Sequence, residues 1–395
     1  MMLSVMVVGA GAAFSDQSKI KNTEAVDACT ALNIIGGYPD GSFKPEGNIT
    51  RAEVTKMICV ALNGGKNPAV STNTTPTFSD VRNNANAAWA EGYIESCAAQ
   101  GIVSGVGGGK FAPNGNVTGV QLAKMLLVSL GYKSENEGFT GNAWATNVNV
   151  RAAQKGLYKG LEKMDTNAAI TRDNAAQMVW NALNAYEVEY KTTLTTDKNG
   201  QLTSQIVVQD KVSGVNGKTK ITLLEDKYEA DTAIGTFAGN SDVTGCKDGD
   251  IRITNATING AGDDTYTFKY DLDLKYLGEE VKVLYKDHKD GVDGKLDDKD
   301  TIYGVYVTGT TTVYNITKND LQNQKENGTV RFGDKNYDVA SVKKDVEYLN
   351  VNYGASKTTA KTNMNANAVA KAFTDLKATS ADTIKFVCND DGDIV

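Results

Sequence analysis

The chain has 395 residues, a net charge of −7 and 41% hydrophobic residues, which is typical of a globular protein with room for two or three domains. The acid excess and the lack of a basic stripe argue against nucleic acid as a partner. The only histidine is His288 and the five cysteines form no CxxC pair, so a Ser-His-Asp triad, a zinc site or a redox centre has little to be built from. We therefore expect no enzyme, and we interpret the cysteines as small buried hydrophobic residues.

Residues 1–13 form a short apolar run that ends in small residues, with Ala10 and Ala12 in the A-x-A spacing of a leader cleavage site. No Lys or Arg precedes Lys19, so the basic segment of a complete leader is missing. We interpret residues 1–13 as the remnant of a secretory signal peptide, and a buried N-terminal strand is the alternative. No other segment approaches the roughly 20 apolar residues that a membrane helix needs.

Residues 33–62 align without gaps on residues 101–130, so the sequence contains an internal repeat. Twelve of the thirty aligned positions are identical, and they are concentrated at turns and apolar positions. The identical residues, in the numbering of the first segment, are Ile34, Gly37, Gly41, Phe43, Pro45, Gly47, Asn48, Thr50, Lys56, Met57, Val60 and Leu62.

A third, more degenerate copy follows the first two. It keeps Trp144, Thr171 and Met178 at matching positions, but its loop is two residues shorter and has lost the Phe and the Pro. Each copy opens on a similar tripeptide, FSD, FSD and FTG. The copies are predicted to span residues 14–63 (copy one), 78–132 (copy two) and 139–190 (copy three).

Each copy is predicted to fold as a helix, a turn-rich loop and a second helix. In copy one the loop "GGYPDGSFKPEGN" has Pro-Asp-Gly turn chemistry, and Phe43 is its predicted core residue. Thr50 and Glu53 form a capping box at the start of the second helix. Arg51 lies inside this box without a helical partner, in a place where the helix dipole disfavours a cation.

Apolar residues at helical spacing predict one buried face on each helix. The two helices of a single fifty-residue copy cannot bury these faces alone, so the copies are expected to pack on each other about a shared axis. In copy one these residues are Ala25, Val26, Cys29 and Leu32, then Val54, Met57, Ile58 and Ala61. Their counterparts in the second helices of copies two and three are Leu122, Met125, Leu126, Ser129, Ala175, Met178, Val179 and Ala182.

These copies resemble the S-layer homology (SLH) domain, whose pattern is an opening F-x-D, a W-A helix, G-I-x-x-G-Y-x-D-G-x-F-x-P and then T-R-A-E. The resemblance covers residues 14 to about 190, and copy one matches with "GGYPDGSFKP" and "ITRAE". It implies a multidomain α plus β chain that begins with a three-repeat helical bundle, a pseudo-threefold SLH trimer. It also implies a secreted surface protein that binds secondary cell-wall polymer, which is often pyruvylated, and that self-associates in a surface lattice.

Carried over position by position, the resemblance assigns polymer binding to the T-R-A-E motif. A ketal carboxylate suits an arginine fork, and free N–H groups at a helix start would add a second anion-binding element. Copy two reads "TGVQ", so Gly119 replaces the arginine. We expect Arg51→Ala to weaken wall binding with little effect on folding. The implied contacts are Thr50, Arg51, Glu53, Thr171 and Arg172, with Trp89 and Trp144 as candidates to line sugar-binding grooves or, alternatively, to lie in the core.

Residues 191–395 are predicted to form one or two mainly antiparallel β modules that are displayed on the surface, and the natural chain is expected to continue beyond them. Runs rich in Thr, Val, Ile and Tyr alternate with Gly, Asn and Asp. The predicted strands are "SQIVVQD", "TKITLLED", "YTFKYDL", "EEVKVLYKD", "DTIYGVYVTGTTTVYNI" and "TIKFVCND", and one helix is expected at 366–377.

The loop "DHKDGVDGKLDDKD" at residues 287–300 holds six aspartates between two predicted strands. Oxygen ligands in a Gly-rich loop suit calcium, and the weak candidates are Asp287, Asp290, Asp293 and Asp297. The spacing does not fit an EF-hand, and three lysines dilute the charge, so we favour a solvated hairpin tip over a calcium site. We expect no other cofactor.

Two alternatives to a wall-anchored surface protein stay open. An SLH-tethered polysaccharide-acting enzyme would need two carboxylates about 5–10 Å apart across a cleft, and the sequence nominates no such pair. An outer-membrane tether or porin of a diderm bacterium would need strands of roughly 10 residues with aromatic girdles, whereas the strands predicted here are shorter and more polar.

Overall fold

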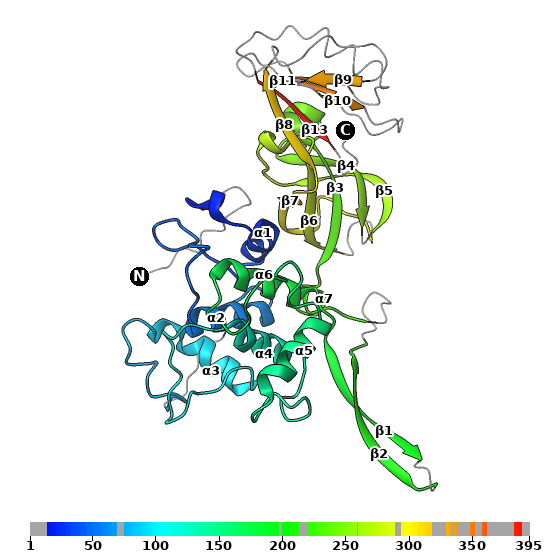
Figure 1. Ribbon diagram of the computed structural model, residues 1–395. Coiled ribbons are helices and arrows are strands. Elements are labelled where there is room, and N and C mark those ends of the chain that lie inside the picture. The colour runs from blue at the N-terminus through cyan, green and yellow to red at the C-terminus, as the bar shows by residue number, and fades with distance from the viewer. Residues whose placement is uncertain are drawn as a thin grey trace. The chain divides into compact units, whose positions relative to one another are not determined.

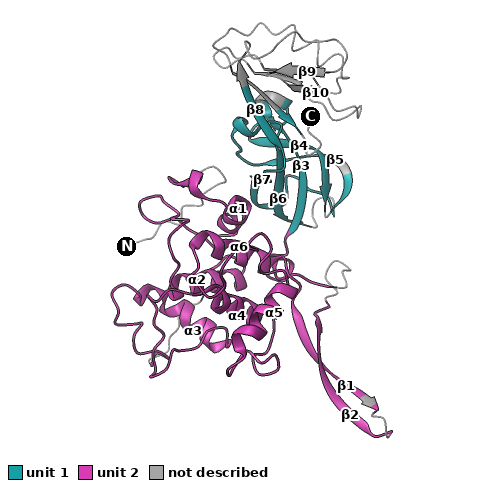
Figure 2. Ribbon diagram, in the orientation of Figure 1, with its two compact units in different colours: residues 1–11, 231–395 teal, residues 12–230 magenta. Residues whose placement is uncertain are grey.

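The computed structural model divides the chain into two units, residues 12–230 and residues 231–395 together with 1–11 (Figure 2). The predicted leader remnant at 1–13 and the predicted helix at 366–377 lie outside the residues that the structure describes. The structure describes residues 14–68, 75–196, 200–212, 220–258, 260–288, 294–317, 329–332, 335–338, 348–351, 358–361 and 383–388. Within them, no helix is long and apolar enough to cross a membrane.

The unit at 12–230 is mainly helical, as the apolar spacing predicts, and it includes a long two-stranded hairpin that extends away from the helices (Figure 1). Each predicted copy contributes one helix before its loop and one after it. Its elements are α1 (Thr23–Ala31), α2 (Arg51–Leu62), α3 (Glu91–Ala99), α4 (Gly119–Ser129), α5 (Trp144–Gln154), α6 (Arg172–Leu183), β1 (Val188–Thr196), β2 (Leu202–Asp210) and α7 (Leu223–Tyr228).

The three helices that follow the loops begin in the same way. Thr50 and Thr118 each accept a hydrogen bond from the backbone three residues on, and the side chains of Glu53 and Gln121 complete capping boxes, as predicted. In α6 the Thr171 side chain accepts from the Asn174 N–H. These caps fix where α2, α4 and α6 start, and therefore where the residue after each Thr lies.

A closed ring of backbone hydrogen bonds joins the residues just before these caps. The Ile49 N–H donates to Ile170 O at 3.1 Å, the Ile170 N–H to Val117 O at 2.8 Å, and the Val117 N–H to Ile49 O at 3.2 Å. All three side chains are buried. Segments far apart in the sequence thus meet at one point inside the unit.

The first two N–H groups of each of these helices also donate to carbonyls of a loop in another copy. This arrangement contradicts the expectation of free N–H groups for an anion, because in α2, α4 and α6 they are already bonded within the protein. The donor–acceptor pairs are Arg51–Gly115, Ala52–Pro113, Gly119–Ala168, Val120–Thr166, Arg172–Gly47 and Asp173–Pro45, at 2.8 to 3.4 Å.

The F-x-D tripeptides anchor the loops. Phe43 and Phe111 are buried as predicted, with ring centroids 5.4 and 5.3 Å from Phe14 and Phe78. The carboxylate of Asp80 accepts hydrogen bonds from the Phe111 and Ala112 N–H groups at 2.8 and 2.9 Å. Burial opposes ionisation, yet these two donors lower the pKa of Asp80. The loop of copy one is therefore held at Phe43 beside the helix start of copy three, and the loop of copy two is held at Phe111 beside the helix start of copy one.

The segment "TKITLLED" was predicted as a strand, and this prediction is wrong, because Thr222 makes only an isolated bridge to Tyr186 and a helix begins at Leu223. Residues 223–228 form α7, because Thr222 and Glu225 make a capping box that the sequence analysis overlooked. Leu223, Leu224 and Tyr228 are buried, so the helix packs by its apolar side.

The unit at 231–395 contains a five-stranded antiparallel sheet in the order β5-β4-β3-β6-β7. The predicted strands at 266–272 and 279–287 overlap two of its strands, whereas the single strand predicted at 300–316 is divided into one strand in this sheet, at 301–307, and one outside it, at 312–317. Its core includes Phe237, Ile253, Phe268 and Tyr285. The strands are β3 (Asp231–Asn240), β4 (Asp250–Ile258), β5 (Ala261–Lys269), β6 (Glu280–Lys286) and β7 (Thr301–Val307), followed by the pairs β8 (Thr312–Thr317) with β13 (Thr383–Cys388), β9 (Thr329–Phe332) with β10 (Lys335–Asp338), and β11 (Tyr348–Val351) with β12 (Thr358–Lys361). Two short helices, α8 (Ser241–Thr244) and a 3-10 turn at Leu274–Tyr276, lie in the connections.

Candidate functional site

Arg172 is the more buried of the two motif arginines, with 8% of its surface exposed. Its Nε donates to Phe43 O at 2.9 Å, and Nη1 lies 3.4 Å from Glu53 Oε1. The guanidinium stacks over Tyr38, 4.7 Å from the ring centroid. An arginine at the start of α6 therefore lies against the loop of copy one and already faces a carboxylate.

Both carboxylate oxygens of Glu53 accept hydrogen bonds. Oε2 accepts from the Thr50 N–H at 2.9 Å and from the Thr50 hydroxyl at 2.8 Å, while Oε1 accepts from the Tyr38 hydroxyl at 2.6 Å. Although burial raises the pKa of this carboxyl, these donors and the charge of Arg172 lower it overall. Burial and the neighbouring carboxylate raise the pKa of Tyr38 to about 12. Thr50 and Glu53 are thus committed to the helix start and to Arg172.

Arg51 occupies the corresponding place against the loop of copy two. Nε donates to Phe111 O at 2.9 Å, Nη2 donates to Ser104 O at 2.8 Å, and the guanidinium lies 4.5 Å from the Phe111 ring centroid. Burial lowers the pKa of Arg51, although the charge of Asp80 opposes the shift. Arg51 therefore has a structural role between two copies, and the expectation that Arg51→Ala leaves folding almost unchanged conflicts with these contacts.

The two arginines differ in their countercharge. No carboxylate among the described residues lies within 4.0 Å of the Arg51 guanidinium, and its Nη1 makes no hydrogen bond within that part of the chain. At the position of Glu53, copy two has the neutral Gln121, whose Oε1 accepts from the Thr118 N–H at 3.1 Å. Arg51 thus keeps both a positive charge and unused donors.

Two half-buried lysines lie beside the motif tryptophans. Lys56 Nζ is 6.0 Å from the Trp89 ring and 5.9 Å from the Tyr93 ring, and Lys124 Nζ is 5.7 Å from the Trp144 ring. Burial lowers the pKa of Lys56, and the positive charge of Arg172 nearby lowers it further.

The structure places Trp89 at the surface, with 48% of its side chain exposed, and Trp144 half-buried, so neither is a core residue. The sequence analysis did not nominate Lys56 or Lys124. The available signal was a lysine repeated in the same place among the core residues of α2 and α4.

Gly119, which takes the arginine's place in copy two, has no room for a side chain. A Cβ there would lie 3.1 Å from both Met164 Cε and Thr166 Cα and 3.3 Å from Thr166 O. The shorter loop of copy three closes directly over the start of α4. The space that an arginine would need at this position is therefore taken up by Met164 and the Thr166 backbone.

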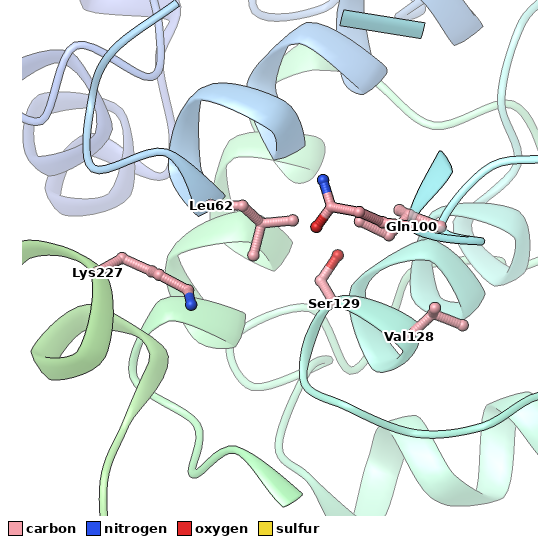
Figure 3. A pocket seen from close by; sticks show the side chains of 6 residues that line it. Leu62, Gln100, Val128, Ser129 and Lys227 are labelled. Atoms are coloured by element: carbon pink, nitrogen blue, oxygen red, sulfur yellow. The ribbon is translucent and has the colours of Figure 1, made fainter. Parts of the chain in front are cut away.

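A shallow pocket lies at the other end of these helices (Figure 3). It is lined by Leu62 at the end of α2, Val128 and Ser129 near the end of α4, and Lys227 of α7, together with Gln100 and Ile102. None of the motif residues lines it, and we assign it no role.

Of the calcium candidates, Asp290 and Asp293 lie outside the described residues. Asp287 Oδ2 accepts from the Gly294 N–H at 2.7 Å, and Asp297 Oδ1 accepts from the Lys299 N–H at 2.9 Å, as in a hydrogen-bonded loop. Among the described residues, no cluster of three His, Cys, Asp or Glu side chains could hold a metal ion. Calcium binding stays an untested prediction.

Comparison with known proteins supports the resemblance. The family model "S-layer homology domain" matches residues 13–55 and 77–123. The chain is 24% identical over 274 residues to the middle cell wall protein of Brevibacillus brevis, which covers 68% of this chain and 24% of that protein. It is 31% identical over 155 residues to the cellulosome-anchoring protein of Acetivibrio thermocellus, covering 36% of this chain and 34% of that protein.

A third relative is the surface-layer 125 kDa protein of Lysinibacillus sphaericus, 26% identical over 242 residues, which is 55% of this chain and 20% of that protein. The chain thus spans about a third or less of the length of these relatives. The matches support an SLH-containing protein of the bacterial cell surface, with SLH sequence at residues 13–55 and 77–123.

Proposed function

We propose that this chain anchors a secreted, S-layer-type surface protein to the bacterial cell wall by binding secondary cell-wall polymer without a covalent bond. The SLH matches and the names of the relatives, which include a cellulosome-anchoring protein and surface-layer proteins, support anchoring. The polymer itself, and its pyruvylated end, follow from the family resemblance and from the chemistry of the arginine sites.

We infer that residues 139–190 are a third, degenerate SLH copy and that the three copies form a pseudo-threefold bundle. The ring of hydrogen bonds among Ile49, Val117 and Ile170 supports this arrangement. So does the equivalent start of α2, α4 and α6, where each helix bonds a loop of another copy.

The observation that carries the proposal is the state of Arg51. Two carbonyls fix its guanidinium in place, the Phe111 ring supports one face, and no carboxylate of the described chain lies within 4.0 Å of it. A fixed, partly desolvated fork with unused N–H donors suits a planar carboxylate, such as a pyruvate ketal. Arg172 is the weaker contact of the two, because a ligand carboxylate there would compete with Glu53.

The lysine–tryptophan pairs fit the sugar part of such a ligand. An exposed indole offers an apolar face for a pyranose ring, and an ammonium beside it offers donors for hydroxyl or anionic groups. Trp89 with Lys56 and Trp144 with Lys124 are proposed in this role. Thr50, Glu53 and Thr171 support the sites through the helix caps.

Sedimentation of the full chain with purified cell walls tests the proposed function. The protein should co-sediment with intact walls and stay in the supernatant after the walls have been stripped of secondary polymer with acid. Adding the released polymer should compete with binding to intact walls. Equal binding to stripped and intact walls would refute polymer binding, and no binding to either would refute anchoring.

We propose attachment without catalysis, so incubation of walls with the protein should release no soluble saccharide or peptide.

We also propose self-association in a lattice. One face of the β1–β2 hairpin supports this, because Leu194, Leu202 and Ile206 are 72%, 74% and 60% exposed on it. Light scattering at rising concentration should show assembly that Ile206→Ser weakens, and monodisperse monomer throughout would contradict it.

A further inference from the structure

Two cysteines meet where α2 packs on α3. Cys59 lies in the last part of α2 and Cys97 near the end of α3, and 3% and 0% of their surfaces are exposed. The two thiols lie close enough for each to shift the pKa of the other. Cys97 Sγ also lies 3.8 Å from Thr55 O. Cys97 Sγ therefore lies against the turn of α2 that leads to Cys59, in a buried contact between copy one and copy two.

The matching positions in the rest of the unit have only one sulfur or none. Cys29 is the counterpart of Cys97 in α1, and its Sγ lies 4.0 Å from the O atom of Ala176, which is the counterpart of Thr55. At the position of Cys59, nine residues after the capping Thr, copy three has Trp180 and copy two has Leu127. Ordinary apolar side chains fill these positions, so the cysteine pair is not required to fill the space.

The environment of Cys59 also favours thiol chemistry. The interaction with the Cys97 thiol and the Ser96 hydroxyl lowers the pKa of Cys59, although burial opposes the shift. The thiolate is the nucleophile in disulfide exchange, and the best attacking thiol has a pKa near the ambient pH. Exported proteins also meet an oxidising environment in which disulfides persist.

We propose that Cys59 and Cys97 form a disulfide in the exported protein and so join α2 of copy one covalently to α3 of copy two. The Cys59 thiolate attacks the disulfide of an oxidised low-molecular-weight thiol or thiol oxidoreductase and releases one thiol. Cys97 then loses its proton and attacks Cys59 in the mixed disulfide, which releases the second thiol. The oxidant's disulfide is reduced to two thiols and one protein disulfide forms, so atoms and electrons balance.

The bond would close a loop between residues 59 and 97, across the contact that also holds Arg51 against copy two. A crosslink of this loop length restricts the unfolded chain enough to raise the Tm by about 10 °C. The inference does not depend on the proposed ligand, because it concerns only the packing of two helices.

Thiol counting on the full chain tests it. After incubation with oxidised glutathione, alkylation in denaturant should label three of the five cysteines, and digestion should give a peptide that links Cys59 to Cys97 with a mass 2 Da below the sum of the two. The Tm should be higher without dithiothreitol than with it. Cys29→Ala is the matched control: two of its four cysteines should be labelled, and it should keep the linked peptide and the Tm difference, whereas Cys97→Ala should lose the linked peptide and the Tm difference.

Five labelled cysteines after oxidation of the native protein would overturn the proposal, and so would a link that involves another cysteine pair. If Cys97→Ala does not fold, the comparison of the wild-type chain with and without reductant still decides the question, since it needs no variant.

Discussion

Replacing Arg172 by Ala should destabilise the helical unit strongly, because the side chain bridges copy three and copy one. The Nε bond to Phe43 O is charge-assisted and worth about 1.5–3 kcal/mol. Stacking of the guanidinium over Tyr38 adds about 0.5–2 kcal/mol. Glu53 keeps its hydrogen bonds from Thr50 and Tyr38 when Arg172 is removed, so the loss of its positive partner adds little further destabilisation. The loss totals about 3 kcal/mol.

In a domain of roughly 200 residues, such a loss lowers the Tm by about 6–12 °C, which differential scanning calorimetry of the full chain resolves. Lys191→Ala is the control. Lys191 is 53% exposed and pairs with Glu189 at 3.0 Å, and an exposed pair of this kind adds little to stability. A Tm of the Arg172→Ala protein within about 2 °C of the wild type would refute the role assigned to these contacts.

Two further substitutions test other parts of the helical unit. Burial raises the pKa of Asp27 from its ordinary value of 3.8 to about 6, although a hydrogen bond from Gln17 opposes the shift. Above pH 6 the carboxylate is ionised in the folded protein, and its burial lowers the free energy of unfolding. Below pH 3.8 the group is protonated in both the folded and the unfolded chain, so this destabilisation disappears. Asp27→Asn should therefore raise the Tm at pH 8 by an amount equivalent to about 1–3 kcal/mol and much less at pH 4, and an equal gain at both pH values would contradict this origin. Gly119→Arg should lower the Tm instead of adding a third binding site, because a Cβ already meets Met164 and Thr166 at 3.1 Å. Gly92→Ala in α3, where nothing lies within 4 Å of the new Cβ, is its control and should raise stability by up to about 1 kcal/mol, and a stable Gly119→Arg protein would show that the loop of copy three can move.

Local signals predicted the helical copies well. The spacing of Val54, Met57, Ile58 and Ala61 identified the buried face of α2, and the capping box identified its first residue. α7 was missed because Thr222 and Ile221 favour a strand locally, while the Thr222–Glu225 box that sets the helix was overlooked.

The contacts of the arginines could not be predicted in the same way. Arg51 had no visible partner because its acceptors are the carbonyls of Ser104 and Phe111, and a carbonyl belongs to every residue type. The same reason explains the incorrect expectation of free N–H groups at the helix starts, since the carbonyls that satisfy them come from loops of other copies. The T-R-A-E motif is visible in the sequence. Only the three-dimensional packing shows which of its residues hold two copies together and which keep donors for a ligand.

The affinity of the full chain for purified, pyruvylated secondary cell-wall polymer tests the central claim most directly. Calorimetric titration well below the Tm should give a dissociation constant at least tenfold higher for Arg51→Gln than for the wild type, because a charge-assisted contact worth about 1.5–3 kcal/mol is lost. Lys191→Ala should bind as the wild type does. If a folded Arg51→Gln protein binds the polymer within twofold of the wild type, Arg51 does not hold the ligand, and the account of this site is wrong.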